Sequence, residues 1–194
     1  IEIRQKQNLL CTKNGAHVFT AGRMTLPGVR KGGTMQQQEF IQAVRDAETT
    51  MYHVAMSILR NEADSADAVQ EALLKAFEKL DTLNEEKYFR TWLTRILIHE
   101  CYQIQRKKKR LVPYEEYVER EPGKEDKLYT DLYDAIDDLP EDLRVAVTLF
   151  YIEGFSIAEI AKMLGSRENT VKTRLYRGRN QLRKILGDKE EALC

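Results

Sequence analysis

Apolar residues recur every three to four positions along most of this chain, a spacing that predicts amphipathic helices. The stripe over residues 40–58 predicts one long helix that ends near Asn61. Similar stripes over residues 69–80 and 89–104 predict two more helices, separated by the polar loop 81–88. We find no segment that alternates apolar and polar residues as a strand would. The pattern therefore predicts an all-α fold.

Charged residues and helix breakers indicate where the helices begin. Asp64 and Asp67 complement the helix dipole, so we expect the second helix to start near them. Two prolines, a glycine and many acids fall within residues 111–126, which is typical of a linker. A helical stripe resumes just after Lys127 and precedes Pro140, a residue that suits a first helical turn. We therefore expect a second helical domain over residues 127–194.

The stretch over residues 156–186 predicts two helices joined by a tight turn. Ser156 and Glu159 form a capping box that starts the first helix. Gly165 follows this helix and can adopt a left-handed conformation without steric cost. Ser166 is then placed to cap the second helix. The buried stripe of the first helix is expected to contain Ile157, Ile160, Ala161 and Leu164.

The second of these helices has one apolar face and one cationic face. Its inner face is expected to contain Val171, Leu175, Gly178, Leu182 and Ile185. The opposite face contains Asn169, Thr173, Tyr176, Arg177 and Asn180, with Lys172 on its flank. A helix-turn-helix places such a face in the major groove of DNA. An ordinary solvated helix of a helical hairpin is the alternative.

The net charge is zero at pH 7, but basic and acidic residues are segregated along the chain. Residues 87–110 hold eight basic residues and one acid, whereas residues 111–142 hold three basic residues and twelve acids. The basic helix of the helix-turn-helix follows. This order is expected when an acidic connection joins two modules that bind polyanions.

Composition excludes several other classes of protein. With 194 residues, of which 42% are hydrophobic, the chain can form one domain or two small ones. No run approaches the roughly 20 apolar residues of a membrane span, and no signal peptide pattern occurs. We therefore expect a cytoplasmic protein without stable membrane insertion. Three widely separated cysteines and no His/Cys cluster indicate free thiols, no metal and no cofactor.

The third predicted helix interleaves basic residues with Trp92, His99 and Tyr102. Cations and aromatic rings together suit unpaired bases of single-stranded DNA. Alternatively, Trp92 belongs to the core, His99 is a partly exposed helix residue, and the basic run 106–110 is a solvated helix end.

Several segments, in this order and spacing, resemble a bacterial sigma factor of the extracytoplasmic-function group. They are DSADAVQEALLKAFEKL, YFRTWLTRI, RKKKR and LPEDLRVAVTLFYIEGFSIAEIAKMLGSRENTVKTRLYRGRNQLR. The resemblance implies a region 2 like domain over residues 35–110, a linker over 111–126 and a region 4 like domain over 127–194. Residues 1–34 would be a mobile extension or a translated leader, with Met35 a natural start.

The resemblance also assigns expected contacts. Four residues of the second helix would bind the clamp coiled coil of the largest polymerase subunit: Asp67, Gln70, Glu71 and Lys75. A loop and the third helix would bind the melted minus-ten element through Asn84, Lys87, Tyr88, Arg90, Arg95, Tyr102, Arg106 and Lys107. The helix-turn-helix would bind double-stranded minus-thirty-five DNA through Arg167, Lys172, Thr173, Arg174, Tyr176 and Arg177, with Arg174 on a phosphate.

These expectations predict a promoter-specificity subunit of RNA polymerase with no chemistry of its own. We also expect an anti-sigma factor as a regulatory partner. The acidic linker would thread the polymerase channel, or would be a plain tether. Two other classes remain open: a stand-alone helix-turn-helix regulator, and a helical metal-dependent nuclease whose carboxylates converge on a metal.

Overall fold

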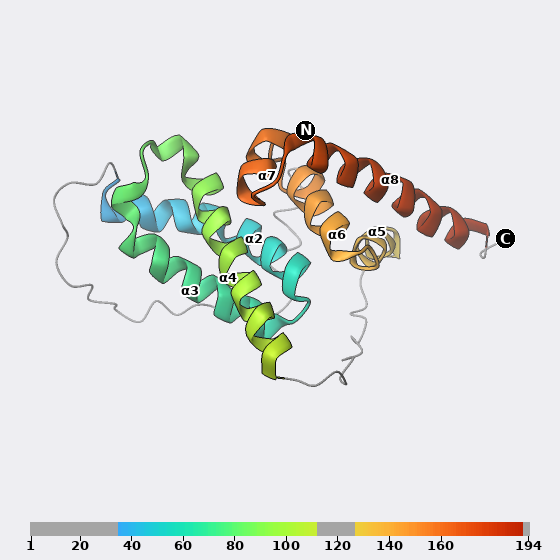
Figure 1. Ribbon diagram of the computed structural model, residues 1–194, viewed down its shortest axis with the longest axis horizontal. Helices are drawn as coiled ribbons and strands as arrows, with labels where there is room; N and C mark the ends of the chain where they lie inside the picture. Colours follow the sequence, from blue (N-terminus) through green and yellow to red (C-terminus); the bar gives the residue numbers. More distant parts are fainter. Residues whose placement is uncertain (1–34, 112–126, 192–194) are drawn as a thin grey trace. The chain divides into compact units, whose positions relative to one another are not determined.

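The structure is a computed structural model that describes residues 35–111 and 127–191. The predictions for the N-terminal extension and for the linker concern residues 1–34 and 112–126, which lie outside the described residues. The described residues are helical and contain no strand, so the all-α prediction is confirmed (Figure 1).

The helices fall into two groups along the chain, which we call the first and second helix groups (Figure 1). The first helix group contains α2 (Gln37–Leu59), α3 (Glu62–Glu78) and α4 (Phe89–Leu111), with the 3₁₀ turns η1 (Leu80–Thr82) and η2 (Glu86–Tyr88) between α3 and α4. The second helix group contains α5 (Lys127–Asp137), α6 (Glu141–Val147), the π-helical turn η3 (Thr148–Ile152), α7 (Ile157–Met163) and α8 (Glu168–Glu191).

Helix α3 begins earlier than the two aspartates suggested. Asn61 is its N-cap, and its side-chain Oδ1 accepts a hydrogen bond of 2.9 Å from the Asp64 backbone N–H. The preceding Arg60 has a left-handed backbone, with φ of 52°, and ends α2. A short polar side chain outside the helix satisfies a free backbone N–H more directly than a charge within it. Asp64 therefore lies in the first turn of α3, and Asp67 lies beyond it.

Helices α2, α3 and α4 pack on one another around buried apolar side chains. The Phe40 ring of α2 meets the rings of Phe77 and Phe89 edge-on, each with centroids 5.7 Å apart. On α3, small residues at every fourth position, Ala68, Ala72 and Ala76, are fully buried. Small side chains allow neighbouring helices to approach closely. The apolar stripe predicted over residues 69–80 faces this core, since Ala72 and Ala76 are buried and the rest of the stripe packs against it: Val69, Leu73, Phe77 and Leu80.

In the second helix group, α8 lies directly against α6. A Cβ atom added to Gly178 of α8 would lie 2.7 Å from Cγ2 of Val147 on α6, so only glycine fits without rearrangement. Pro140 is the N-cap of α6, consistent with the predicted helix start.

One hydrophobic core extends across both helix groups. The largest buried cluster joins Val54 of α2 and Leu97 of α4 to Leu149, Ile160 and Val171 of the second group. The described residues of both helix groups accordingly belong to one compact unit. The residue boundaries of the two predicted domains stay a prediction, although the two groups of helices correspond to their order.

The buried Arg144 of α6 also links the two helix groups. Its Nε donates to the backbone oxygen of Ser57, in the last turn of α2, at 2.7 Å. Its Nη1 donates to the backbone oxygens of Asp137 and Leu139, at the end of α5, at 3.0 and 2.8 Å. Carbonyls at helix ends lack intrahelical donors and attract cations. One guanidinium therefore caps two helices.

Candidate nucleic-acid interface

The first helix of the helix-turn-helix, α7, begins with the predicted capping box. The Ser156 hydroxyl accepts from the Glu159 backbone N–H at 3.3 Å, and the Glu159 carboxylate accepts from the Ser156 backbone N–H at 2.9 Å. Burial would raise the pKa of Glu159, but the hydrogen bonds from Ser156 and Thr91 and the charge of Arg90 lower it below its ordinary value. The ionised carboxylate thus keeps the cap closed at neutral pH.

The turn between α7 and α8 is a Schellman motif. Gly165 has the predicted left-handed backbone, with φ of 59°, and its backbone N–H donates to the Lys162 carbonyl at 3.4 Å. The Ser166 backbone N–H donates to the Ala161 carbonyl at 2.9 Å. Ser166 therefore closes α7, and the prediction that it caps α8 is wrong. Its hydroxyl is buried and has no hydrogen-bond partner among the residues that the structure describes, because α8 begins two residues later, at Glu168.

Helix α8 exposes the face that the sequence predicted. Val171, Leu175 and Gly178 are buried against the second helix group. Four of the predicted DNA-binding residues of α8 are exposed: Lys172, Thr173, Tyr176 and Arg177. Tyr176 is 60% exposed.

The two remaining residues predicted to contact the minus-thirty-five element differ in their surroundings. Arg167 precedes α8 and is exposed. Arg174 is half-buried, and its Nε lies 3.5 Å from an Asp142 carboxylate oxygen of α6. Arg174 therefore does not share the free face of Lys172 and Arg177.

The loop before α4 exposes three of the predicted minus-ten residues, Asn84, Lys87 and Tyr88. The Lys87 Nζ lies 2.7 Å from a Glu85 carboxylate oxygen and 4.8 Å from the Tyr88 ring centroid. The hydrogen bond with Glu85 raises the pKa of Lys87. A cation beside an exposed ring suits stacking of an unpaired base.

Helix α4 separates the other predicted minus-ten residues onto two sides. Arg95, Arg106 and Lys107 are exposed. Tyr102 is half-buried, and burial and the nearby Glu141 of α6 raise its pKa. Arg90 also faces the second helix group, where its guanidinium lies 2.8 Å from the carboxylate of Glu153. The structure thus brings only part of the predicted set together on an open surface.

The outer face of α3 exposes Asp67, Gln70 and Glu71. Sequence reasoning missed Leu74 on this face, a residue that is 49% exposed. Its spacing of three, four and seven residues from the three polar residues was the available signal. Lys75 lies beside the face and pairs with two carboxylates, Glu71 at 3.1 Å and the buried Glu100 of α4 at 2.5 Å.

Other residues that the sequence analysis named as candidates make contacts within the fold. Trp92 packs against the core, with its ring 6.0 Å from that of Phe89, as in the alternative reading. Nδ1 of the exposed His99 lies at a hydrogen-bond distance of 2.9 Å from a Glu100 carboxylate oxygen. Cys101 is a free thiol, as predicted, and burial raises its pKa to about 12.

Among the described residues no His, Cys, Asp or Glu cluster could hold a metal ion. Within the same residues, no helix is both long and apolar enough to cross a membrane.

Two family models match this chain. Sigma-70 region 2 matches residues 43–111, and Sigma-70, region 4 matches residues 129–182. The first match corresponds closely to α2–α4, and the second to α5 through most of α8.

Relatives and solved structures agree with these matches. The chain is 34% identical over 146 residues to the RNA polymerase sigma factor SigV of Bacillus subtilis, covering 74% of this chain and 88% of SigV. It is 31% identical over 178 residues to the ECF RNA polymerase sigma factor SigW of the same organism, covering 82% of this chain and 94% of SigW. The sigma factor RpoE of Bartonella quintana, solved with the anti-sigma factor NepR, has a TM-score of 0.68 and 29% identity, covering 77% of this chain and 98% of RpoE. CnrH, solved with the cytosolic domain of CnrY, has a TM-score of 0.59 and 25% identity, covering 79% of this chain and 90% of CnrH.

The helix-turn-helix, the basic α4 and these similarities lead to one assignment. The chain belongs to the extracytoplasmic-function group of bacterial RNA polymerase sigma factors, the subunits that give the polymerase its promoter specificity.

Proposed function

We propose that this sigma factor directs RNA polymerase through three surfaces: the outer face of α8 on double-stranded DNA, the loop and exposed side of α4 on the melted strand, and the outer face of α3 on the polymerase. Binding alone is its action, in the cytoplasm, without catalytic chemistry of its own. The observation that carries the proposal is the exposed set of Lys172, Thr173, Tyr176 and Arg177 on the second helix of the helix-turn-helix.

The face of α8 is suited to the major groove of the minus-thirty-five element. Arginine and lysine can read guanine edges, and a threonine or tyrosine side chain can contact bases or phosphates. The Thr173 hydroxyl donates to the Asn169 carbonyl of its own helix at 2.8 Å, which leaves its methyl group for an apolar contact with thymine. Arg167 and Arg174 lie at the sides of this face and would contact phosphates.

The α4 surface is suited to single-stranded minus-ten DNA. Tyr88 is a 49% exposed ring with a lysine beside it, and Arg95, Arg106 and Lys107 continue the positive charge along the helix. Each stacked base contributes about 1–3 kcal/mol, and cations hold the backbone. These contacts would offset the few kcal/mol that unstacking of a base costs.

The α3 surface is suited to a protein partner, and the polymerase clamp coiled coil is our proposal for it. Exposed Leu74 lies among Asp67, Gln70 and Glu71, an arrangement with an apolar centre and a polar rim. Lys75 would act here mainly by holding Glu71 in place.

An anti-sigma factor is the second partner that we propose. The structures of RpoE and CnrH that resemble this chain were solved with the anti-sigma factor NepR and the cytosolic domain of CnrY, respectively. A protein that covers any of the three surfaces would prevent initiation.

Transcription in vitro with purified core polymerase tests the α8 proposal. Arg177→Ala should reduce initiation at a cognate promoter by roughly 5- to 150-fold, because a base-edge contact contributes about 1–3 kcal/mol. Arg183→Ala is the matched control, since Arg183 is an exposed arginine of the same helix outside the predicted reading face. Equal activity of the two variants would remove Arg177 from the reading face. Tight specific DNA binding without polymerase would instead favour a stand-alone regulator.

A further inference from the structure

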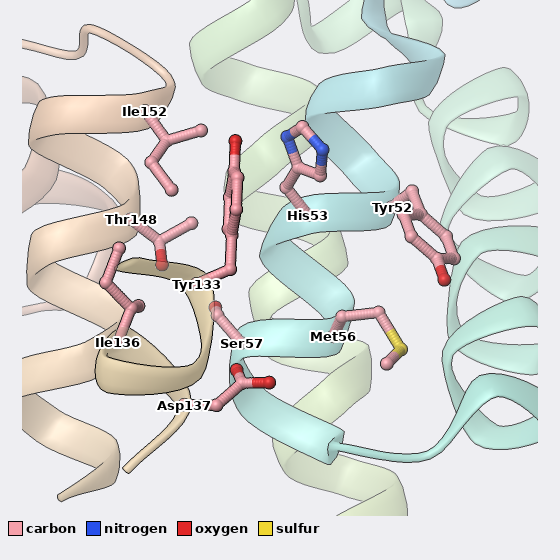
Figure 2. Close-up of a pocket in the computed structure, with 9 residues that line it drawn as sticks. All are labelled: Tyr52, His53, Met56, Ser57, Tyr133, Ile136, Asp137, Thr148 and Ile152. Carbon is pink, nitrogen blue, oxygen red and sulfur yellow. The ribbon is translucent and has the colours of Figure 1, made fainter. Parts of the chain in front are cut away.

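Three charged side chains are buried among the described residues: Arg144, Glu153 and Glu100. Arg144 caps the ends of α2 and α5. A carboxylate oxygen of Glu153 lies 2.7 Å from Nδ1 of His53, which lines a groove between α2, α5 and η3 (Figure 2). Both of these contacts join the two helix groups. Glu100 differs from them, because the partners of its carboxylate belong to the first helix group.

Each oxygen of the Glu100 carboxylate has a partner. Glu100 is 5% exposed and lies in the middle of α4. Its Oε2 accepts a hydrogen bond of 2.5 Å from Lys75 Nζ of α3, and its Oε1 lies 2.9 Å from His99 Nδ1. Burial would raise the pKa of Glu100, but the hydrogen bonds with Lys75 and His99 lower it below its ordinary value. The carboxylate is therefore ionised at neutral pH and presents a fixed negative charge to α3.

Lys75 links this buried charge to the outer face of α3. Its side chain is 34% exposed, and its Nζ also lies 3.1 Å from a carboxylate oxygen of Glu71, one turn earlier on the same helix. The hydrogen bond with Glu100 raises the pKa of Lys75, so the ammonium keeps its charge. A lysine side chain is flexible, and the buried carboxylate gives this one a single direction.

Glu71 is the exposed end of this chain of contacts. Its side chain is 51% exposed, and it lies beside the exposed Leu74 on the outer face of α3. A pair between two exposed side chains orders them little, because both move freely in water. Here the lysine is held by a buried carboxylate of another helix, α4. The direction of the Glu71 side chain therefore depends on a residue outside α3.

We infer that Glu100 is a positioning residue for polymerase binding, which acts through Lys75 to hold the Glu71 carboxylate in one direction. This inference rests on the polymerase role proposed for the outer face of α3. Glu100 is buried and cannot itself touch the polymerase. Its contribution is to order Glu71 before the polymerase arrives, so that less side-chain freedom is lost on binding.

A double-mutant cycle in the full-length chain tests this path. An equilibrium titration measures the affinity of each labelled variant for purified core polymerase. Glu100→Gln keeps the size of the side chain but removes the charge that holds Lys75. Binding should weaken roughly 2- to 12-fold, the effect of one more side chain that must be ordered on binding. Glu48→Gln is the matched control, at an exposed glutamate of α2, and should bind as the original chain does.

The second arm of the cycle separates positioning from fold stability. Glu71→Ala removes the carboxylate that Glu100 is inferred to orient, and it should itself weaken binding. Glu100→Gln should then have no further effect in the Glu71→Ala chain. A loss of fold stability would weaken binding by the same factor in both chains. An equal effect in the two chains would therefore overturn the inference.

The single variants distinguish this inference from the proposed function. If Glu71→Ala weakens binding and Glu100→Gln does not, the α3 interface stands and the positioning role of Glu100 is overturned. If neither variant weakens binding, the polymerase contact of Glu71 and the positioning role are both overturned. If Glu100→Gln alone weakens binding, Glu100 acts by a route other than Glu71, which also overturns the inference.

Circular dichroism checks folding, and Lys75→Met is the second variant if Glu100→Gln does not fold. It breaks the same link from the α3 side, at a position that is partly exposed. It should weaken binding in the original chain and have no effect in the Glu71→Ala chain. An effect of Lys75→Met that persists in Glu71→Ala would overturn the inference.

Discussion

Replacement of Arg144 by methionine should destabilise the protein more than any change on its DNA-binding faces. The side chain of methionine fills much of the same space but cannot donate a hydrogen bond. Arg144 is 4% exposed and donates to the backbone oxygens of Ser57, Asp137 and Leu139. These bonds join α6 to the ends of α2 and α5. The substitution therefore removes contacts both within the second helix group and between the two groups.

The size of the loss in stability depends on whether each of the three backbone oxygens finds another hydrogen-bond donor. A buried acceptor left without a donor costs about 1–3 kcal/mol. The contacts to Ser57 and Leu139 are buried, whereas the contact to Asp137 is partly buried, where water can replace the donor. We therefore expect a loss of about 3–5 kcal/mol in the free energy of unfolding, out of a total on the order of 5–15 kcal/mol.

Urea unfolding followed by circular dichroism measures this loss. With a slope of about 1–3 kcal/mol per molar urea, the midpoint should fall by roughly 1–5 M. Arg183→Met is the control, because Arg183 is exposed on α8 and should change the midpoint little. If Arg144→Met unfolds at the same urea concentration as this control, Arg144 does not hold the helix ends as described.

Three further predictions concern packing, acid stability and polymerase binding. Gly178→Ala should lower the free energy of unfolding, measured in urea, by about 0–2 kcal/mol, because overpacking against Val147 opposes the gain of about 1 kcal/mol in helix propensity. Gly187→Ala is the control and should stabilise the protein, because there is open space around Gly187. The reverse order of stabilities would contradict the close approach of α8 to α6. Burial would raise the pKa of Glu153, but hydrogen bonds from His53 and Thr50 and the charge of Arg90 lower this pKa below its ordinary value of 4.5. The ionised carboxylate therefore stabilises the fold fully above about pH 4.5, and this stabilisation is lost as the pH falls through the lowered pKa. Urea midpoints measured from pH 7 to pH 3 should decrease less steeply below pH 4.5 in Glu153→Gln, and parallel curves would refute this. Leu74→Ala should weaken core polymerase binding about tenfold in an equilibrium titration, whereas Leu132→Ala, at an exposed leucine of α5, should not; equal affinities would place the polymerase interface elsewhere.

Local rules predicted much of this fold because the deciding contacts lie within a few residues of each other. The Ser156 and Glu159 cap and the left-handed Gly165 are of this kind, and both were read from sequence. Ser166 was misread because its backbone, not its hydroxyl, completes the turn. A capping residue and a helix-closing residue can occupy the same position in the sequence pattern.

Contacts between distant residues explain what sequence reasoning could not supply. The amphipathic pattern correctly predicted that Lys172 and Arg177 are exposed. It could not show that Arg90 meets Glu153, 63 residues away, or that Lys75 meets Glu100, 25 residues away. Periodicity gives the direction of a side chain on its own helix, but not which other element lies there. Leu74 was missed for the same reason, since a single apolar residue on a polar face becomes informative only when its exposure is known.

The π-helical turn η3 makes the position of Glu153 tolerant of a change in chain length. A π turn contains more residues than an α-helical turn, so loss of a single codon within residues 148–152 is absorbed by reversion to regular α-helix. The residues that follow then keep their direction about the helix axis, whereas the same deletion within a regular α-helix such as α8 would rotate them by about 100°. Glu153 would therefore still face Arg90 and His53. The chain before the helix-turn-helix thus accepts the loss of one residue that α8 does not.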